Sequence, residues 1–256
     1  MSSKSPLKGA PRRVAGQSAD EQLDSVLTDR VLEPILLTCL AWGLAGSEWL
    51  RYVNPYKPMP VPFTIVAVLI MVYAVVRILR ARPEIRNLRL GRDGERVVGE
   101  VLESLRAGGC KVFHDLIGPT FNVDHVMIGR QGLFVIETKT ISKPIGRSPI
   151  VRYDGTQVLV DGHRPDRDPI RQVSLLADWV AKQIKESCGK VCPIRPVVLY
   201  PGWFIEVSGR SEVWVLNPKA FPKYVGNEPE VLSDDDVKVI SLQLSRHSRE
   251  SNRRDS

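Results

Sequence analysis

The hydrophobic positions of this chain form two long uninterrupted stretches first and shorter periodic patterns afterwards. Residues 58–76 contain no charged side chain over 19 positions, and residues 34–47 contain none over 14. A helix rises about 1.5 Å per residue, so the longer stretch approaches the ~30 Å thickness of a hydrocarbon core. The longer stretch therefore predicts a transmembrane helix.

The shorter stretch crosses a membrane only if residues 31–50 are used, with Trp49 and Tyr52 as interfacial anchors. A re-entrant or interfacial helix is the alternative for this stretch. A third interpretation makes both stretches buried core helices of one soluble domain. If both cross, the Pro-rich connector 51–60 joins two antiparallel spans. The sequence thus predicts a transmembrane helical hairpin over residues 31–80.

Positive charge is concentrated directly after the second stretch. The chain has a formal net charge of +7, and residues 77–92 hold six arginines against the single Glu84, a net +5. Basic clusters next to a span stay on the cytoplasmic side. This cluster predicts a multi-pass protein of the cell (inner) membrane with both termini in the cytosol. The basic balance then reflects topology and contact with anionic lipid through 77–92, and by itself does not indicate nucleic-acid binding.

Polar segments flank these regions. Residues 1–30 are rich in Ser, Pro, Gly and mixed charge, which predicts a disordered cytosolic arm. No cleavable signal peptide is indicated, because the first apolar stretch begins behind this long arm. We interpret residues 81–92 as a basic juxtamembrane linker and residues 246–256 as a disordered tail. Weak phosphate contact is the alternative role for the arginines of the tail, which are Arg246, Arg249, Arg253 and Arg254.

Residues 93–245 are long enough for one packed domain, and their pattern alternates between helix and strand. This order around a central hairpin predicts an α/β sandwich with a mixed sheet. The expected helices cover residues 93–107, 168–187, 218–224 and 234–246. The expected strands cover residues 110–116, 123–129, 132–141, 194–200 and 213–216, with a small hairpin over 150–160.

The central hairpin brings charged side chains together. Two runs rich in β-branched and aromatic residues bracket the glycine-bounded turn 129–132. With a two-residue loop, paired residue numbers sum to 261, so Asp124 falls opposite Glu137. A three-residue loop would break this register. Alternation along the strand puts Lys139 on the same face as both acids.

Directly opposed carboxylates lie roughly 5 Å apart and destabilise a sheet unless something compensates them. A divalent cation is the obvious compensation, and two hard carboxylate ligands suit Mg²⁺, with Mn²⁺ as an alternative. Lys139 adds an ammonium group, which suits a positioned water beside a phosphate. The plainer interpretation is a solvated hairpin face. The strongly apolar run Phe134–Ile136 makes that interpretation the weaker one.

Four motifs follow one another in a recognisable order. They are Gly94-Glu95-x-x-Val98 in a helix, Asp124-His125, the run Gly132-Leu-Phe-Val-Ile-Glu-x-Lys139, and Asp168-Pro-Ile-x-Gln172 opening a second helix. This order resembles the NERD family, the nuclease-related domain of the PD-(D/E)xK superfamily, over about residues 91–216. Val123 stands where the superfamily name has Pro, at a position that tolerates other residues in the family.

The resemblance implies a restriction-endonuclease-like α/β sandwich and a divalent metal, Mg²⁺, bound by Asp124 and Glu137. It also implies that Lys139 orients or activates the attacking water, and that Glu95 and Gln172 support the site. The implied partner is nucleic acid, with DNA favoured over RNA.

The supporting residues can also be weighed without the family. Glu95 borders a stripe of apolar residues at helical spacing, whereas Glu100 projects nearly opposite into solvent. An acid in the first helical turn also complements the helix dipole, which explains Glu95 equally well without a site role. Gln172 would attract no notice without the family pattern.

Other polar residues are less informative. His125 points to the sheet face opposite Asp124, and both a hydrogen-bonded core histidine and a role at the phosphate are open. Cys188 and Cys192 are spaced like half of a zinc site whose other half is missing, so we interpret them as reduced thiols.

Two loops, 142–149 and 161–168, are either solvated or flank a substrate groove. Their basic residues include Lys143, Arg147, Arg164 and Arg167.

The sequence as a whole predicts a membrane-tethered, cytosol-facing nuclease that hydrolyses phosphodiester bonds with Mg²⁺. An alternative of another class is a catalytically inactive module that binds nucleic acid or a protein partner at the membrane. The hairpin triple of Asp124, Glu137 and Lys139 favours catalysis, because a binding module has no need to hold two carboxylates in opposition.

Overall fold

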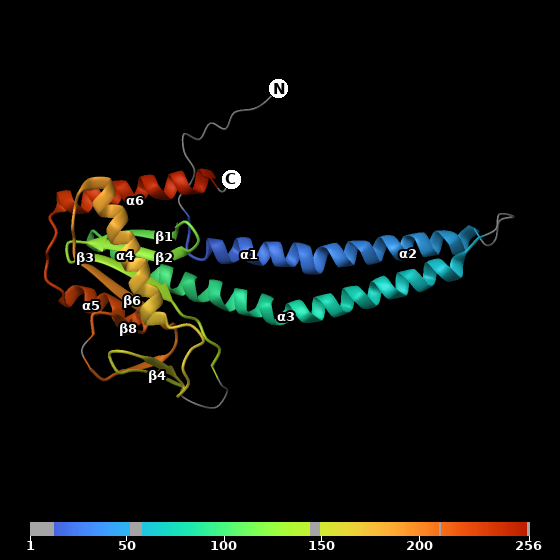
Figure 1. Ribbon diagram of the computed structural model, residues 1–256, viewed down its shortest axis with the longest axis horizontal. Coiled ribbons are helices and arrows are strands. Elements are labelled where there is room, and N and C mark those ends of the chain that lie inside the picture. Colours follow the sequence, from blue (N-terminus) through green and yellow to red (C-terminus); the bar gives the residue numbers. More distant parts are fainter. Residues whose placement is uncertain (1–12, 52–57, 144–148, 210, 255–256) are drawn as a thin grey trace, which may run out of the picture. The chain divides into compact units, whose positions relative to one another are not determined.

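The structure, a computed structural model, describes residues 13–51, 58–143, 149–209 and 211–254 (Figure 1). It divides into two compact units. One covers Ser18–Arg89, and the other combines the residues up to Gln17 with those from Leu90 onward. The connector residues 52–57, including Tyr52, lie outside the described residues, as do Arg147 and residues 1–12 of the arm predicted over 1–30.

The first unit is helical. It contains α1 (Gln17–Leu27), a π-helical turn (Thr28–Leu32), α2 (Glu33–Arg51) and the first part of α3 (Pro60–Ser104). Small residues line the seam between α2 and α3, where Ala41, Ala45 and Ala67 are buried against one another. The Trp49 indole N–H donates to the Thr64 hydroxyl across the same seam, at 2.9 Å. The two helices therefore pair as an antiparallel hairpin.

Large apolar side chains cover the outside of this hairpin. Two helical stretches, Gln17–Arg51 and Pro60–Gly108, are long and apolar enough to cross a membrane by length and composition. Most of their apolar side chains are exposed, Leu40 and Leu69 at 62% each, so the two helices do not form the buried core of a soluble domain in the described structure. The exposed surface agrees with the predicted pair of spans.

Three segments are more helical than predicted. Residues 17–30 are helix rather than disordered arm, because Leu23 gives α1 a buried contact. Residues 81–92 continue α3 without a break. The predicted disordered tail is also wrong up to residue 254, since α6 (Asp234–Arg254) runs through it. Three aspartates in its first turn complement the helix dipole, and Leu244 and Ser248 bury its inner face.

The second unit is built on a five-stranded sheet in the order β1-β2-β3-β6-β8. The strands β1 to β3 pair antiparallel, whereas β3, β6 and β8 run parallel. Their bounds are β1 Lys111–Ile117, β2 Asn122–Gly129, β3 Gly132–Thr138, β6 Ile194–Leu199 and β8 Trp214–Leu216. The predicted mixed sheet is therefore confirmed.

A smaller three-stranded sheet, in the order β5-β4-β7, stands beside the main one. It contains β4 (Ile150–Tyr153) and β5 (Val158–Val160), which form the predicted small hairpin. The third strand, β7 (Phe204–Val207), pairs parallel with β4 and was not predicted. Its short sequence is largely exposed, so no alternating burial pattern marks it.

Helices cover both faces of the main sheet (Figure 1). On one face, α4 (Pro169–Cys188) and α6 pack over a core that includes Val126, Val135 and Val198. On the other face, Val98 and Leu102 of α3 join α5 (Phe221–Asn227), which follows a short 3-10 turn at Pro218–Ala220. The result is an α/β sandwich, as the sequence predicted.

A buried ion pair joins Arg13, which precedes α1, to the sheet. The Arg13 guanidinium donates to the Asp115 carboxylate at 2.7 Å, and both side chains are buried. Asp115 also has a φ of 49°, a left-handed conformation that Asp and Asn tolerate better than other side chains. A buried ion pair leaves an uncompensated charge when either partner is removed.

We therefore expect Arg13→Ala to lower the free energy of unfolding by about 3–5 kcal/mol. The double variant Arg13→Ala/Asp115→Asn should recover much of this loss, because the buried charge is gone and Asn tolerates the same backbone conformation. Denaturant unfolding of the full chain measures both. Equal stability of the single variant and the parent would contradict this assignment.

Candidate active site

The turn between β2 and β3 sets the position of both candidate acids. The register runs from Gly129↔Gly132 to His125↔Ile136, so paired numbers sum to 261 as predicted. The next step along this register brings Asp124 level with Glu137. The Asp124 carboxylate accepts a hydrogen bond from the Thr138 backbone N–H at 2.7 Å, which closes the end of the hairpin.

Glu137, Lys139 and Gln172 form a closed triangle of hydrogen bonds. The Lys139 ammonium donates to Glu137 Oε1 at 2.7 Å and to the Gln172 side-chain oxygen at 2.8 Å. The Gln172 amide nitrogen donates to the same Glu137 oxygen at 2.6 Å. Every one of these bonds to Glu137 uses Oε1. The structure thus brings the residue named from the second helix into direct contact with the hairpin.

Two local features position the side chains of Lys139 and Gln172. The Lys139 backbone N–H donates to the Leu199 carbonyl at 2.8 Å, which continues the parallel pairing of β3 with β6. Asp168 caps α4 by accepting from the backbone N–H groups of Ile170 and Arg171. This cap starts the helix so that Gln172 falls in its first turn, over the end of β3.

Both acids have a pKa above the usual range of a carboxyl group. Loss of hydration raises the pKa of Asp124 well above its usual range, and the charges of Glu137 and Glu95 raise it further. The Thr138 N–H and the Lys139 ammonium oppose this shift. Burial likewise raises the pKa of Glu137, and Lys139 and Gln172 oppose it. The protein therefore compensates the negative charge of this pair only in part.

Glu95 reaches this group from the second half of α3. It is half-buried, and its charge acts on Asp124, whereas Glu100 is exposed on the same helix. Gly94 explains the close approach of the helix, because a Cβ at this position would lie 1.8 Å from the Thr140 hydroxyl oxygen. The helix can lie this near the end of the hairpin only with glycine at position 94.

Several polar atoms in this region are buried without a hydrogen-bond partner among the described residues. They include Glu137 Oε2, the hydroxyl oxygens of Thr138 and Thr140, and the Tyr200 hydroxyl. An unmet carboxylate oxygen beside a second carboxylate suits a cation or an ordered water. Across the residues that the structure describes, however, no group of three His, Cys, Asp or Glu side chains is arranged to hold a metal. The donor set that fits Mg²⁺ is the pair of Asp124 and Glu137.

Tyr200 is a candidate that the sequence analysis missed. It directly follows β6, and its fully buried hydroxyl lies within the electrostatic reach of Glu137 and Asp168, which together with burial raise its pKa. The carboxyl ends of neighbouring parallel strands meet at one edge of a sheet. The strand expected over 194–200 ends at this residue. A prediction that this strand pairs parallel with β3 would therefore have identified Tyr200 as a site candidate.

His125 lies on the opposite face of the sheet, as alternation predicts. Its Nδ1 atom is 2.8 Å from His114 Nδ1, and His114 Nε2 is 2.7 Å from the Glu103 carboxylate. Burial lowers the pKa of both histidines. His125 is thus a hydrogen-bonded core histidine, which settles the two alternatives left by the sequence.

The loops that were expected to flank a groove are only partly described. Lys143 contacts the Gly202 carbonyl and lies over the Trp203 ring, 6.0 Å from its centroid. Arg164 and Arg167 are exposed, and Arg171 is exposed one residue before Gln172. Basic side chains therefore stand next to the first turn of α4.

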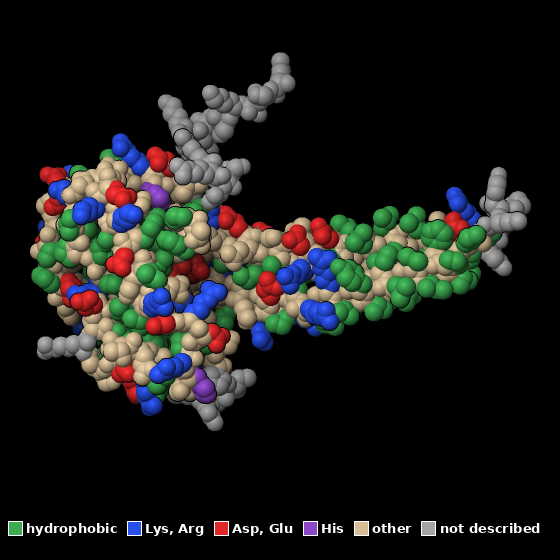
Figure 2. All heavy atoms as spheres, viewed as in Figure 1, with side chains coloured by type: hydrophobic (Ala, Val, Ile, Leu, Met, Phe, Trp, Pro, Cys, Tyr) green, Lys and Arg blue, Asp and Glu red, His purple; other side chains and the backbone are tan. Residues whose placement is uncertain are grey.

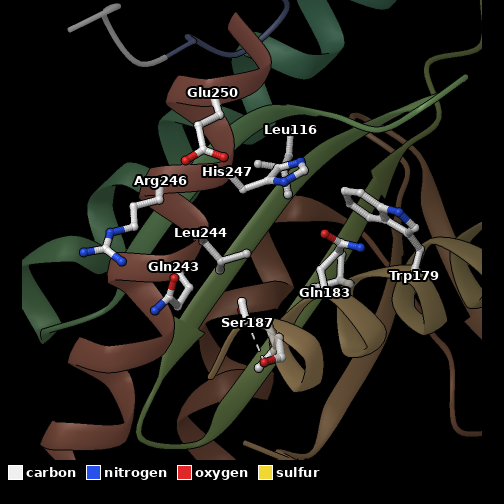
Figure 3. Close-up of a pocket in the computed structure, with 11 residues that line it drawn as sticks. Leu116, Trp179, Gln183, Ser187, Gln243, Leu244, Arg246, His247 and Glu250 are labelled. Carbon is white, nitrogen blue, oxygen red and sulfur yellow. Dashed lines mark hydrogen bonds between the residues drawn. The ribbon is translucent and has the colours of Figure 1, made fainter. Parts of the chain in front are cut away.

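A separate cavity lies between α4 and α6 and contains none of the predicted site residues (Figure 3). Its volume is about 270 Å³. Trp179 forms one wall, in edge-on contact with His247, and His247 is anchored to the Ile117 carbonyl at 2.9 Å. The labelled side chains come from the two helices and from Leu116 of β1, and we interpret the cavity as a gap where the covering helices diverge.

One comparison with known proteins gives a match. The family model described as "Nuclease-related domain" matches residues 90–201. This range includes all five residues predicted for the site, which are Glu95, Asp124, Glu137, Lys139 and Gln172. No curated protein and no solved structure matches the chain.

The contact between Gly94 and Thr140 can be tested directly. We expect Gly94→Ala to force α3 away from the hairpin, to cost about 1–3 kcal/mol of stability, and to displace Glu95. The matched control is Gly91→Ala on the same helix, where a Cβ meets nothing within 4 Å and should instead stabilise the helix by about 0.5–1 kcal/mol. Denaturant unfolding compares the two. Equal effects would show that the approach at Gly94 is not tight.

The repulsion between the acids predicts a pH dependence. A carboxyl group whose pKa is raised by folding adds stability below its unfolded pKa of about 4, and this contribution is lost as pH rises through its folded pKa. Asp124→Asn removes that loss while keeping an acceptor for the Thr138 N–H. Without divalent metal, its stability relative to the parent should therefore increase as pH rises from 4 to 8. A variant less stable than the parent at pH 8 would contradict the assigned repulsion.

Proposed function

Residues 90–201 belong to the nuclease-related domain family, and on this premise we propose that the protein is a membrane-tethered, Mg²⁺-dependent nuclease that hydrolyses phosphodiester bonds of nucleic acid. The observation that carries the proposal is the convergence of Asp124, Glu137 and Lys139 at one end of the hairpin, with Gln172 in direct contact. We further propose that the domain has the restriction-endonuclease-like arrangement of the PD-(D/E)xK superfamily.

The carboxylates of Asp124 and Glu137 are the proposed holders of the cation. Their raised pKa values and the unpartnered Glu137 Oε2 support this assignment, because both indicate negative charge that the protein compensates only in part. When bound at such a pair, Mg²⁺ supplies polarisation of a phosphate oxygen and a more acidic water. Glu95 adds negative charge nearby, and its proposed role is to support the same pair.

Lys139 is the proposed group that positions the water and stabilises developing negative charge. An ammonium group has three N–H donors. Two of those bonds are accounted for, one to Glu137 and one to Gln172. Among the described residues the third donor has no acceptor, so we assign it to a water molecule or a phosphate oxygen. Because the other two bonds fix the direction of the side chain, this donor is held in place before substrate arrives.

The substrate and the location are further parts of the proposal. DNA is the expected substrate rather than RNA, and the exposed Arg164, Arg167 and Arg171 supply phosphate contacts next to α4. The two apolar helical stretches support insertion into the cell (inner) membrane. The arginines of 77–92 support an orientation with both termini and the catalytic domain in the cytosol.

A second function is a non-catalytic module that binds nucleic acid or a protein at the membrane. One observation favours it: the described part of the chain has no three-residue group of His, Cys, Asp or Glu arranged to hold a metal. A vestigial site would retain the fold and the hydrogen-bonded triangle without turnover.

The deciding experiment is a cleavage assay on the full chain in mild detergent. Circular and linear DNA and RNA are each incubated with Mg²⁺, with Mn²⁺ or with a chelator. The proposal expects cleavage that requires the divalent ion, with DNA cut faster than RNA. Absence of cleavage of every substrate under all metal conditions would favour the binding module.

Lys139→Ala should lower the cleavage rate by about 10²–10³-fold, because it removes a donor aimed at developing charge. The matched control is Lys111→Ala, which removes an exposed lysine at the start of β1 and should leave the rate unchanged. Rates measured at saturating substrate separate this effect from binding. Equal rates for the two variants would remove Lys139 from the mechanism.

Glu95→Gln and Glu100→Gln form a second matched pair on α3. If Glu95 supports the metal-binding acids, only Glu95→Gln should reduce cleavage, and both variants should keep the melting temperature of the parent. Because Glu95 lies inside α3 rather than in its first turn, the helix dipole does not explain it. Unchanged cleavage in Glu95→Gln would therefore remove this residue from the site.

A further inference from the structure

The helical unit contains a basic cavity of its own. Arg30 of the π-helical turn faces α3, and the cavity between them is lined by Arg30, Tyr73, Val76, Arg77 and Arg80, with a volume of about 360 Å³. Its residues come from segments that are more than 40 positions apart in the sequence. The cavity is therefore a product of the hairpin fold rather than of one helix.

The positive charge in this cavity is only partly neutralised. Arg30 pairs with the Glu84 carboxylate at 3.0 Å. Arg77 instead donates to the neutral Tyr73 hydroxyl at 2.8 Å and lies over the same ring. Arg80 has no ion-pair partner in the described part of the chain. Of the three guanidinium groups that line the cavity, only that of Arg30 pairs with a carboxylate among the described residues, which leaves positive charge for an anion.

The cavity lies where the apolar surface of the hairpin ends. Exposed large apolar side chains extend over α2 from Ile35 to Leu50 and over α3 from Val61 to Leu79. Figure 2 shows several Lys and Arg side chains (blue) gathered where that apolar covering ends. Val76 and Tyr73 line the cavity and also belong to the exposed apolar side chains of α3, so the cavity has an apolar wall that is continuous with that covering.

The backbone at Arg30 is unusual. The Glu33 N–H bonds to the Thr28 carbonyl, so residues Thr28–Leu32 form a π-helical turn between α1 and α2. Such turns are rare and occur frequently at functional sites. Here the turn carries Arg30, which lines the same cavity as Arg77 and Arg80.

From these observations we propose that the cavity binds the phosphate of an anionic phospholipid headgroup. Guanidinium groups match phosphate with paired hydrogen bonds, and the Tyr73 hydroxyl orients one of them. A lipid is the source that fits, because the apolar wall continues into the apolar surface that would contact acyl chains. This inference rests on the membrane insertion proposed above and is independent of catalysis.

The test uses the full chain purified in mild detergent, with bound lipid counted by native mass spectrometry. Phosphatidylglycerol should be retained in preference to phosphatidylcholine. Arg77→Gln/Arg80→Gln should lower this preference by about tenfold or more, since it removes charge-assisted hydrogen bonds. Tyr73→Phe, which keeps every charge, should lower it by a smaller factor. The matched control is Arg86→Gln/Arg89→Gln, which removes the same charge from exposed positions of the same helix outside the cavity.

Each outcome decides the proposal. Loss of the preference in the cavity variants and its retention in the control would support it. Equal losses in both double variants would overturn it in favour of diffuse attraction to the membrane surface. Equal retention of phosphatidylcholine by the parent would also overturn it. If inorganic phosphate displaced the lipid at an equal concentration, the cavity would be a site for soluble phosphate instead. Salt extraction of the parent from membranes separately tests insertion, so failure of the lipid site and failure of the tether are distinguishable.

Discussion

Two carboxylates face each other across the end of a β-hairpin, and the neighbouring side chains are arranged about this pair. Asp124 and Glu137 are held close by the pairing of β2 with β3, and the protein offers them one ammonium group, one amide and one backbone N–H. Loss of hydration raises the pKa of both acids in spite of these partners, and the charges of Glu137 and Glu95 raise the pKa of Asp124 further. A fold that keeps such a pair accepts lower stability at this point, as expected where a site serves chemistry rather than packing.

The surrounding elements can be understood as supports for this pair. The cap at Asp168 starts α4 where Gln172 can bridge Glu137 and Lys139. Gly94 lets α3 approach Thr140, so Glu95 acts on Asp124 from the other side. The helical unit has features of its own. Small residues line the seam between its helices, apolar side chains cover its exterior, and a basic cavity lies where that exterior ends. The proposed nuclease site and the proposed membrane tether therefore rest on two independent sets of residues.

Local signals explain which parts were predictable. The glycines at 129 and 132 fix a two-residue turn, and that turn alone sets the register that opposes the acids. Residues whose position depends on long-range pairing were harder. Tyr200 enters the site only because β6 lies parallel to β3, and the exposed β7 has no burial pattern to announce it. The helix over 17–27 and the last turns of α6 were missed because their sequences are polar, while the few buried contacts that stabilise them, such as those of Leu23 and Ser248, come from distant segments. The family resemblance identified Gln172, which no periodicity would have marked.

The most direct test of the account is the effect of divalent metal on the stability of the full chain. If Asp124 and Glu137 hold a cation, millimolar Mg²⁺ or Mn²⁺ should raise the melting temperature, because a ligand that binds only the folded state stabilises it by mass action. The increase should be largely lost in Glu137→Gln and retained in Lys139→Ala, which removes a positive charge rather than a ligand. A parent melting temperature that is independent of both metals would contradict the account, and so would an equal increase in the parent and in Glu137→Gln.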